Sequence, residues 1–498
     1  MPCVTMLREK GFRAALLERD KAGPWITQHK PDAIIISGGD GSVYESDAPQ
    51  VPPEVLTAVR KDGRPTPVLW ICYGHQWVAQ HFGGTVVNYP RLAEHGESII
   101  ETVGNPTLFR FLPPEQIAFT SHGDTVTKIP DNFFVTARSG RTGAIAAMQS
   151  NDGRFHSVQF HPDSRQTHYG PDILENFVKY TGECIQDWSP SSLITSIAKE
   201  IREASGGRKV LEAYSGGIDS TVVGCIGAKE LGNRLLGVTI DIDNLREGEV
   251  AEIEQNALAG HIPHKVVNAH EDVALFGDVL DAQKKRVIFA IDIYEKRLKA
   301  EAAAFGAELF IDGTLAPDLI ESGNTGSATI KKHHNALANI GLPTLQPLRD
   351  LFKHEVRALA EELGLAKHIA MRKPFPGPGL PLRLVDLPVT HKNLALLRWS
   401  DYETDKILQK DKRFYDEASQ IIVALLGFRS TGVKGDGPVY DISAAVRVVK
   451  TIDYINAKGL YPPQELMDEI IATLTSNRRI VRVLLDATTK PPGTIEYQ

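Results

Sequence analysis

Short apolar runs that end in glycine or other turn residues alternate along the chain with stretches of helical period. This alternation constrains the fold most, because a strand of a parallel sheet is buried on both faces and is followed by a helix that covers the sheet. We therefore expect an α/β fold built on parallel sheets. The segments that carry the pattern are 32–42, 67–84, 155–167, 208–213, 235–243 and 307–322.

The 498 residues suggest roughly two to four domains. Turn-forming residues at 181–192 interrupt the pattern and predict a domain boundary. The segment 372–384 is too rich in proline for a helix or a central strand, so we expect an ordered loop there. Beyond it, mixed helix and strand periods predict a small α+β domain. The expected domains are 1–185, 190–385 and 386–498.

The charge balance favours small substrates over nucleic acid, since 55 basic residues face 62 acidic ones without a long run of either sign. No apolar run reaches membrane-spanning length, and the N-terminus lacks the apolar stretch of a signal peptide. We expect a cytoplasmic protein with neither nucleic-acid nor membrane partners. Four cysteines without disulfide or metal-ligand spacing agree with reduced thiols: Cys3, Cys72, Cys184 and Cys225.

The segment SGGIDS at 215–220 follows an apolar strand and opens a helix near Asp219. Successive backbone N–H groups and the positive end of that helix can bind an anion. A Walker-type loop would need more residues between its glycines and a lysine, and this segment has neither. A glycine pair between a strand and a helix is common in α/β proteins, but SGGIDS as a whole resembles the signature of the ATP pyrophosphatase (PP-loop) superfamily.

That resemblance implies enzymes that attach AMP to a substrate oxygen and release pyrophosphate, with ATP as co-substrate and Mg²⁺ as the metal. Hydroxyl and N–H groups can then hold the leaving pyrophosphate without a lysine. Asp219 could hold the metal or only cap the helix, and Asp241 could face the nucleoside or only end its strand. The implied ATP-binding residues are Ser215, Gly216, Gly217, Asp219, Ser220, Thr221 and Asp241.

Cys72 stands between VLWI and YGHQ, where a buried strand is expected to turn sharply into a helix. Such an elbow exposes and activates a thiol, although a free cysteine is more often a buried structural residue. His161 ends a later strand beside Asp163, as a general base and its orienting carboxylate would. The N–H groups of Gly39 and Tyr73 are candidates for an oxyanion hole.

The segments ICYGHQWVAQHFGG, SHGD at 121–124 and QFHPDSRQT together resemble a class I glutamine amidotransferase domain, over residues 1–185. The resemblance implies that a thiolate attacks the side-chain amide of glutamine, forms a glutamyl thioester and releases ammonia. Gln76 and His122 match positions near the glutamine, and either could instead be structural.

Three features depart from the amidotransferase pattern. Asp163 stands where the family has glutamate, so the carboxylate must orient His161 with one methylene fewer. The chain starts at what resembles the first helix of the family, so we expect the family's first strand and the following loop to be missing. Asp40 replaces a proline that is common after the two glycines.

An amidotransferase followed by a PP-loop segment resembles the glutamine-hydrolysing GMP synthase family over essentially the whole chain. The implied reaction adenylates the C2 oxygen of xanthosine monophosphate (XMP), and ammonia from the first domain then displaces AMP to give GMP. One chain suits this chemistry, because ammonia lost to water becomes ammonium, which is not a nucleophile. Segments in the family's order are 312–322, 330–335, 347–365, 372–380 and 490–498.

By the same resemblance the C-terminal domain forms a homodimer and completes the nucleotide site. Three residues would belong to a lid over the adenylate, although a histidine pair can also mark a metal site or a surface loop: Lys331, His333 and His334. The residues implied to bind XMP are Pro376, Gly377, Pro378, Gly379, Gln420, Lys490, Thr494, Ile495 and Glu496.

Departures in the second half leave alternatives open. The chain has His354, Lys434 and Pro438 where the family has other residues, and it ends in IEYQ rather than IEWE. The acceptor could therefore be an XMP-like nucleotide of a specialised pathway. A paralogue whose glutaminase is impaired and which acts as a regulatory or binding module is a further alternative. A tRNA-modifying PP-loop enzyme would carry an added cysteine motif or a basic domain, and neither is found.

Overall fold

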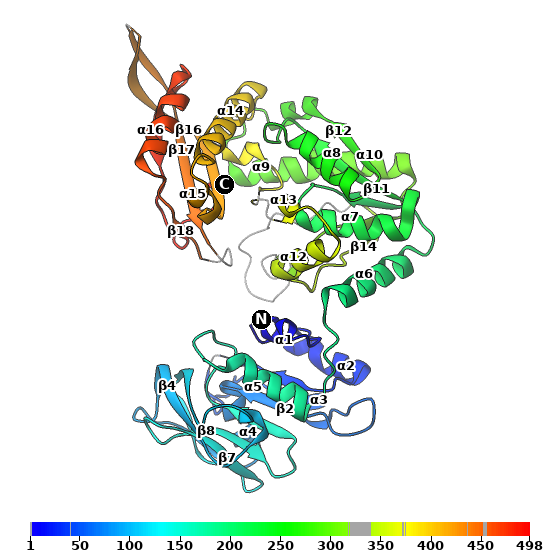
Figure 1. Ribbon diagram of the computed structural model, residues 1–498, viewed down its shortest axis with the longest axis vertical. Helices are drawn as coiled ribbons and strands as arrows, with labels where there is room; N and C mark the ends of the chain where they lie inside the picture. The colour runs from blue at the N-terminus through cyan, green and yellow to red at the C-terminus, as the bar shows by residue number, and fades with distance from the viewer. Residues whose placement is uncertain are drawn as a thin grey trace. The chain divides into compact units, whose positions relative to one another are not determined.

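A computed structural model describes residues 2–39, 41–316, 318, 340–370, 373, 375–435, 437–451 and 456–498. The chain divides into two compact units, Met1–Ser192 and Leu193–Gln498, coloured blue to teal and green to red in Figure 1. Among the described residues, no helix is long and apolar enough to cross a membrane.

The first unit contains a seven-stranded sheet in the order β1-β2-β9-β8-β7-β4-β5. The first three strands in this order run parallel to one another, and the remaining neighbours are antiparallel. The strands are β1 Ile34–Ile36, β2 Val68–Ile71, β4 Glu94–Thr102, β5 Glu115–His122, β7 Phe133–Ser139, β8 Ile145–Ser150 and β9 Phe155–Val158, with β3 Thr85–Asn88 and β6 Asp124–Lys128 as a separate pair. The helices are α1 Pro2–Glu9, α2 Arg19–His29, α3 Pro53–Thr57, α4 Tyr73–His81 and α5 Gly170–Asn176.

The inner strand β2 shows why an apolar run is continuous along the sequence. All four residues of β2 are fully buried, and they divide between two cores on opposite faces of the sheet, with Leu69 and Ile71 in one and Val68 and Trp70 in the other. By contrast, the run at 34–36, for which a buried strand was expected, forms the end strand of the sheet. Because β1 pairs with β2 and with no second strand within the described part of the chain, its three isoleucines remain half-buried.

The second unit begins with helix α6 Pro190–Ser205 and a sheet of five parallel strands in the order β12-β11-β10-β13-β14. The predicted α/β fold is confirmed, and this sheet is parallel throughout, whereas the sheet of the first unit is parallel only over its first three strands. The strands are β10 Val210–Ala213, β11 Leu235–Asp241, β12 His264–Asn268, β13 Leu309–Ile311 and β14 Thr344–Leu345. The helices are α7 Ile218–Leu231, α8 Glu249–Ala259, α9 Ala282–Val287, α10 Lys296–Phe305, α12 Lys353–Glu362 and α13 Lys367–Ala370.

A second sheet of this unit is built on a long antiparallel hairpin, β16 Gln420–Lys434 and β17 Gly437–Lys450. The turn end of the hairpin extends away from the rest of the sheet in Figure 1. The other strands are β15 Leu384–Val385, β18 Lys458–Gly459 and β19 Ile480–Leu485, and the helices are α14 His391–Leu408, α15 Lys412–Glu417 and α16 Gln464–Ser476.

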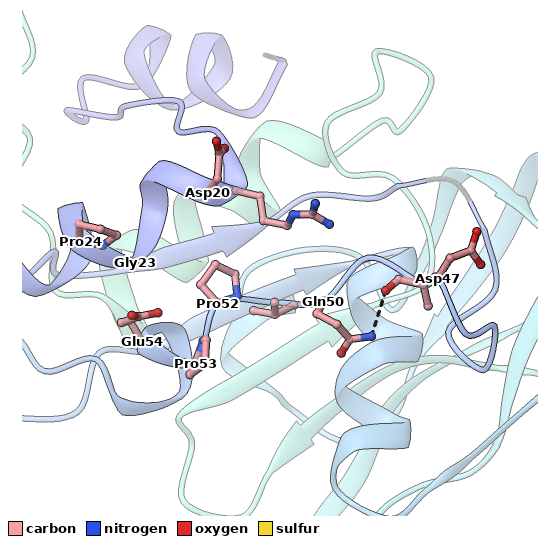
Figure 2. A pocket seen from close by; sticks show the side chains of 11 residues that line it. Asp20, Gly23, Pro24, Asp47, Gln50, Pro52, Pro53 and Glu54 are labelled. Carbon is pink, nitrogen blue, oxygen red and sulfur yellow. Dashed lines mark hydrogen bonds between the residues drawn. The ribbon is translucent and has the colours of Figure 1, made fainter. Parts of the chain in front are cut away.

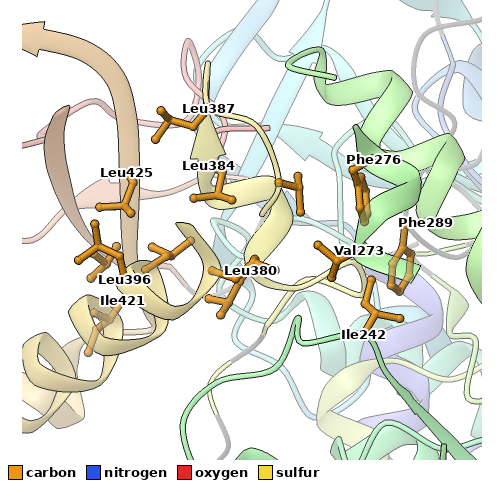
Figure 3. Close-up of a cluster of buried hydrophobic side chains, with 14 of the residues drawn as sticks. Ile242, Val273, Phe276, Phe289, Leu380, Leu384, Leu387, Leu396, Ile421 and Leu425 are labelled. Carbon is orange, nitrogen blue, oxygen red and sulfur yellow. The ribbon is translucent and has the colours of Figure 1, made fainter. Parts of the chain in front are cut away.

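One apolar core joins the two sheets of the second unit (Figure 3). The proline-rich loop leads into a short 3-10 helix, Leu380–Arg383, whose Leu380 is fully buried, as is Leu384 of β15. Each fully buried leucine contributes about 1.5–3 kcal/mol. Leu380 and Leu384 lie between Phe276, which belongs to the part of the unit that contains the parallel sheet, and Leu425 of β16. This core fixes the loop at 376–379 between the two sheets.

Candidate active sites

Cys72 lies at the turn between β2 and α4, where the expected strand, turn and helix are found. Its backbone has φ 52° and ψ −103°, a conformation that a residue with a side chain rarely adopts. Such a conformation costs on the order of 1–3 kcal/mol and persists only where the surrounding structure enforces it. It places the thiol at the N-terminal end of α4, which is the geometry of a nucleophile elbow.

The structure brings Cys72, His161 and Asp163 together. His161 Nδ1 lies 3.2 Å from Asp163 Oδ1. Hydrogen bonds to Asp163 and to Cys72 raise the pKa of His161 to about 10, so the imidazole is a cation beside the thiol at neutral pH. The thiol Sγ also lies 3.9 Å from the carbonyl oxygen of Ser121 and 3.9 Å from Nε2 of Gln159, a contact that the sequence did not reveal.

The glycine turn after β1 contacts these residues through Gly38. A Cβ atom at Gly38 would lie 3.2 Å from His161 Cε1 and 3.3 Å from Cys72 Cβ, so only glycine leaves both side chains in place. Gly39 faces open space. Tyr73 begins α4, where N–H groups have no acceptor within the helix. The oxyanion role of Gly39 and Tyr73 stays a prediction.

Gln76 and His122 are buried and bond to the same main-chain atom. Gln76 Nε2 donates to the carbonyl oxygen of Asp124 at 2.9 Å, and His122 Nδ1 lies 3.0 Å from that oxygen. Burial lowers the pKa of His122. The Asp124 carboxylate accepts hydrogen bonds from Tyr44 and Asn88. The predicted glutamine-binding pair is thus part of a bonded network behind the SHGD segment, and its contact with glutamine stays a prediction.

The first unit also contains a cavity of about 540 Å³ between α2 and the segment that leads into α3 (Figure 2). None of Cys72, His161 and Asp163 is among its lining residues. It is lined by Arg19, Asp20, Gly23, Pro24, Asp47, Ala48, Gln50, Val51, Pro52, Pro53 and Glu54.

In the second unit, residues 215–217 connect β10 to α7 as a compact turn. The Ser215 and Ser220 hydroxyls lie 3.1 Å apart, and Gly217 N donates to Ser215 Oγ at 3.3 Å. Gly216 has φ 69°, and a Cβ atom there would lie 2.6 Å from Ile253 Cγ1. Thr221 is fully buried and donates its hydroxyl to Gly217 O at 2.8 Å. The turn is therefore shaped by its own polar groups at the positive end of a long helix.

A lysine does reach this turn, but from a distant part of the chain. Lys353 at the start of α12 lies with its Nζ 2.6 Å from Asp219 Oδ2. The other carboxylate oxygen of Asp219 is buried and has no hydrogen-bond partner among the described residues. Carboxylate and hydroxyl oxygens are the ligands that Mg²⁺ takes, commonly with only one or two carboxylates and the substrate phosphates. The residues around Asp219 therefore fit a magnesium ion.

That fit depends on phosphate oxygens as well, because no cluster of three or more His, Cys, Asp or Glu side chains forms a metal site within the described ranges. Asp241 ends β11 and accepts a hydrogen bond from His270 Nε2 at 2.9 Å. Its contact with a nucleoside stays a prediction.

Two of the predicted XMP-binding residues meet at one carboxylate. Glu496 accepts from Gln420 Nε2 at 2.7 Å and from Arg383 at 2.9 and 3.1 Å. Arg383, which the sequence did not single out, is 1% exposed and also bonds Asp401 at 3.0 Å. Because Arg383 ends the 3-10 helix that follows residues 376–379, it links the proline-rich segment to the C-terminal segment.

The other residues predicted to bind XMP lie on the loop 376–379 and on the C-terminal segment. The carbonyl oxygens of Thr494 and Ile495 accept from Arg447 at 3.1 Å each. Lys490 pairs through its main chain with Ala457. The loop Pro376, Gly377, Pro378 and Gly379 closes with a hydrogen bond from Gly379 N to Pro376 O. The predicted lid residues Lys331, His333 and His334 lie outside the described residues.

Two family comparisons match the ends of the chain. Residues 3–180 match the family described as glutamine amidotransferase class-I, and residues 407–497 match the family described as GMP synthase C terminal domain.

Relatives named GMP synthase [glutamine-hydrolyzing] match along nearly the whole chain. The relative from Ligilactobacillus salivarius (strain UCC118) is 35% identical over 504 residues, covering 99% of this chain and 95% of its own. That from Thermobifida fusca (strain YX) is 37% identical over 492 residues, covering 94% and 90%. That from Thermosipho africanus (strain TCF52B) is 36% identical over 510 residues, covering 99% and 97%. The chain belongs to the family of glutamine-hydrolysing GMP synthases.

Proposed function

We propose that the chain makes GMP from XMP, ATP and glutamine, with Cys72 as the glutaminase nucleophile and the 215–221 turn as the site of the leaving pyrophosphate. The observation that supports this most is the strained Cys72 elbow beside the His161–Asp163 pair, in a chain that also carries the PP-loop turn. Family membership supports the overall reaction.

In the glutaminase half, the Cys72 thiolate attacks the side-chain amide carbon of glutamine. The His161 imidazolium gives a proton to the leaving nitrogen, so ammonia departs and a thioester remains. His161 then takes a proton from the water that hydrolyses the thioester. In this proposal Asp163 holds the ring through Nδ1, and the N–H groups of Gly39 and Tyr73 stabilise the tetrahedral oxyanion.

In the synthetase half, the C2 oxygen of XMP attacks the α-phosphorus of ATP and pyrophosphate leaves. The leaving phosphates are bound by Ser215, Gly216, Gly217 and Ser220. Lys353 can exchange its ion pair with Asp219 for one with these phosphates. Thr221 serves by holding the first helical turn. Magnesium bound at Asp219 would neutralise phosphate charge. Ammonia then attacks C2 of the adenylated XMP and AMP leaves.

The acceptor nucleotide binds, in this proposal, between the loop 376–379 and the C-terminal segment. Arg383 neutralises Glu496 and holds it against Gln420, so Glu496 keeps a defined orientation for the nucleotide. Lys490 pairs with Ala457 through its main chain, and in this proposal its ammonium group binds a phosphate as a point charge.

The chain also forms a homodimer through its C-terminal region, in our proposal. The extended β16–β17 hairpin exposes large apolar side chains, with Phe428 59%, Val433 78% and Tyr440 65% exposed, which favours burial against a second copy. We expect sedimentation to give twice the mass of the chain. Substituting aspartate at Val433 and Tyr440 should give monomers, and a monomeric unsubstituted chain would contradict the proposal.

The substrate assignment has a direct test. Incubation with ATP, Mg²⁺ and XMP, with either glutamine or ammonium as nitrogen source, should release pyrophosphate and GMP in equal amounts. Xanthosine and IMP serve as matched acceptors that lack the phosphate or the C2 oxygen, and both should leave ATP intact. Pyrophosphate release that does not depend on XMP or a related nucleotide would overturn the assignment.

A further inference from the structure

The hydroxyl of Thr167, six residues after His161, bonds to two main-chain groups around the proposed glutaminase base. Thr167 Oγ1 donates to the carbonyl oxygen of His161 at 2.6 Å and accepts from the N–H of Phe119 at 2.9 Å. The Thr167 residue is only 3% exposed, so these hydrogen bonds are shielded from water.

His161 is also bonded to the same strand directly. Its N–H donates to the carbonyl oxygen of Phe119 in β5 at 2.8 Å. The main chain of His161 is therefore attached to Phe119 on both sides, once through its own N–H and once through the Thr167 hydroxyl. Two residues along β5 is Ser121, whose carbonyl oxygen contacts the Cys72 thiol. These hydrogen bonds, which we call the Phe119 clamp, therefore hold His161 at a fixed position relative to the strand that contacts Cys72.

Phe119 and Gly38 lie on different sides of the His161 imidazole ring. The Phe119 ring lies 6.2 Å from the His161 ring between centroids, at 53°. Gly38 closes another side, since its Cβ position lies 3.2 Å from His161 Cε1. Among the described residues, Asp163 is the carboxylate that bonds the ring, at 3.2 Å, the long end of the range for N–H···O. Asp163 orients the ring, while the main-chain hydrogen bonds hold the backbone position from which the ring extends.

We infer that Thr167 is a positioning residue for His161, which sets the imidazole against Cys72 through the Phe119 clamp. The inference rests on the proposed glutaminase function and deepens it. Thr167→Val keeps the side-chain volume but removes the hydroxyl, which leaves the Phe119 N–H buried without its acceptor. Thr167→Ser keeps the hydroxyl and loses only a methyl group, so it is the matched control.

The test measures turnover with glutamine and with ammonium in the full-length chain. Thr167→Val should lower glutamine-dependent turnover at least ~10-fold, because a displaced base no longer meets the thiol, and should leave ammonium-dependent turnover within about twofold. Thr167→Ser should retain most of the glutamine-dependent turnover. Thr167→Ala, which creates no steric conflict, provides a second variant if the valine enzyme fails to fold.

A second readout separates positioning from mere stability. Alkylation of Cys72 by iodoacetamide at a fixed pH reports the reactivity of the thiol, which depends on the base beside it. The alkylation rate should fall at least ~3-fold in Thr167→Val and return in Thr167→Ser. An unchanged alkylation rate with unchanged turnover, or with a lowered melting temperature alone, would overturn the inference. A wild-type chain that uses ammonium but not glutamine would instead overturn the proposed glutaminase itself.

Discussion

Replacing Cys72 with alanine should abolish glutamine-dependent GMP formation and spare the ammonium-dependent reaction. Removal of a nucleophile from a site of this kind lowers turnover by at least ~10⁴-fold, because the remaining groups have no atom with which to form the thioester. The synthetase site needs only free ammonia, which an ammonium buffer at alkaline pH supplies. GMP formation is followed with each nitrogen source, together with glutamate release.

Cys184 offers a matched control in the same unit. Burial raises the pKa of Cys184 to about 11, so its thiol stays protonated near neutral pH and is inert. Cys184→Ala should therefore leave both activities within about twofold of the wild-type values. Loss of the ammonium-dependent reaction in Cys72→Ala would contradict the division of labour between the two units.

Replacing Asp219 with asparagine should suppress pyrophosphate release whichever nitrogen source is supplied. The substitution removes a carboxylate charge that has one buried oxygen and fits a magnesium ion, and it leaves Lys353 without its ion-pair partner. Loss of one such electrostatic contribution costs roughly 10²–10³-fold in turnover. Steady-state pyrophosphate release at saturating ATP and XMP measures the effect.

Asp278→Asn serves as the control, since Asp278 is an exposed carboxylate of the same unit. It should leave pyrophosphate release unchanged within about twofold. Raising the magnesium concentration should recover part of the Asp219→Asn activity if the carboxylate contributes to metal affinity. Wild-type rates in Asp219→Asn under both nitrogen sources would remove Asp219 from the site.

The sequence predicted the elements that are local in the chain. The run VLWI followed by CYGHQ became β2, the Cys72 elbow and α4, and the run at 210–213 followed by SGG became β10, the turn and α7. In both places an apolar strand, a turn residue and a helical period follow one another directly, so neighbouring residues suffice to identify them. The five-stranded parallel sheet follows from the same alternation.

Features that depend on contacts between distant residues were not predicted. Lys353 lies 134 residues from Asp219 along the chain, and Arg383 lies 113 residues from Glu496. Periodicity gives no information on such pairs. The same reason explains the wrong expectation for 34–36, since the apolar run indicates a strand but not whether a neighbour covers its second edge. Thr167 ends the segment QFHPDSRQT, but a polar residue in a loop produces no periodic pattern from which its role could be predicted.

The apolar core that joins the two sheets of the second unit has a consequence for how this protein can be divided. Leu380 lies in the 3-10 helix after the loop and Leu384 lies in β15, and both are buried by residues from both sides of residue 386. A polypeptide cut there would expose this apolar surface to water on both fragments, so neither fragment keeps the loop in place. We therefore expect the parallel sheet and the hairpin sheet to fold together, because each buries apolar side chains that the other would otherwise expose.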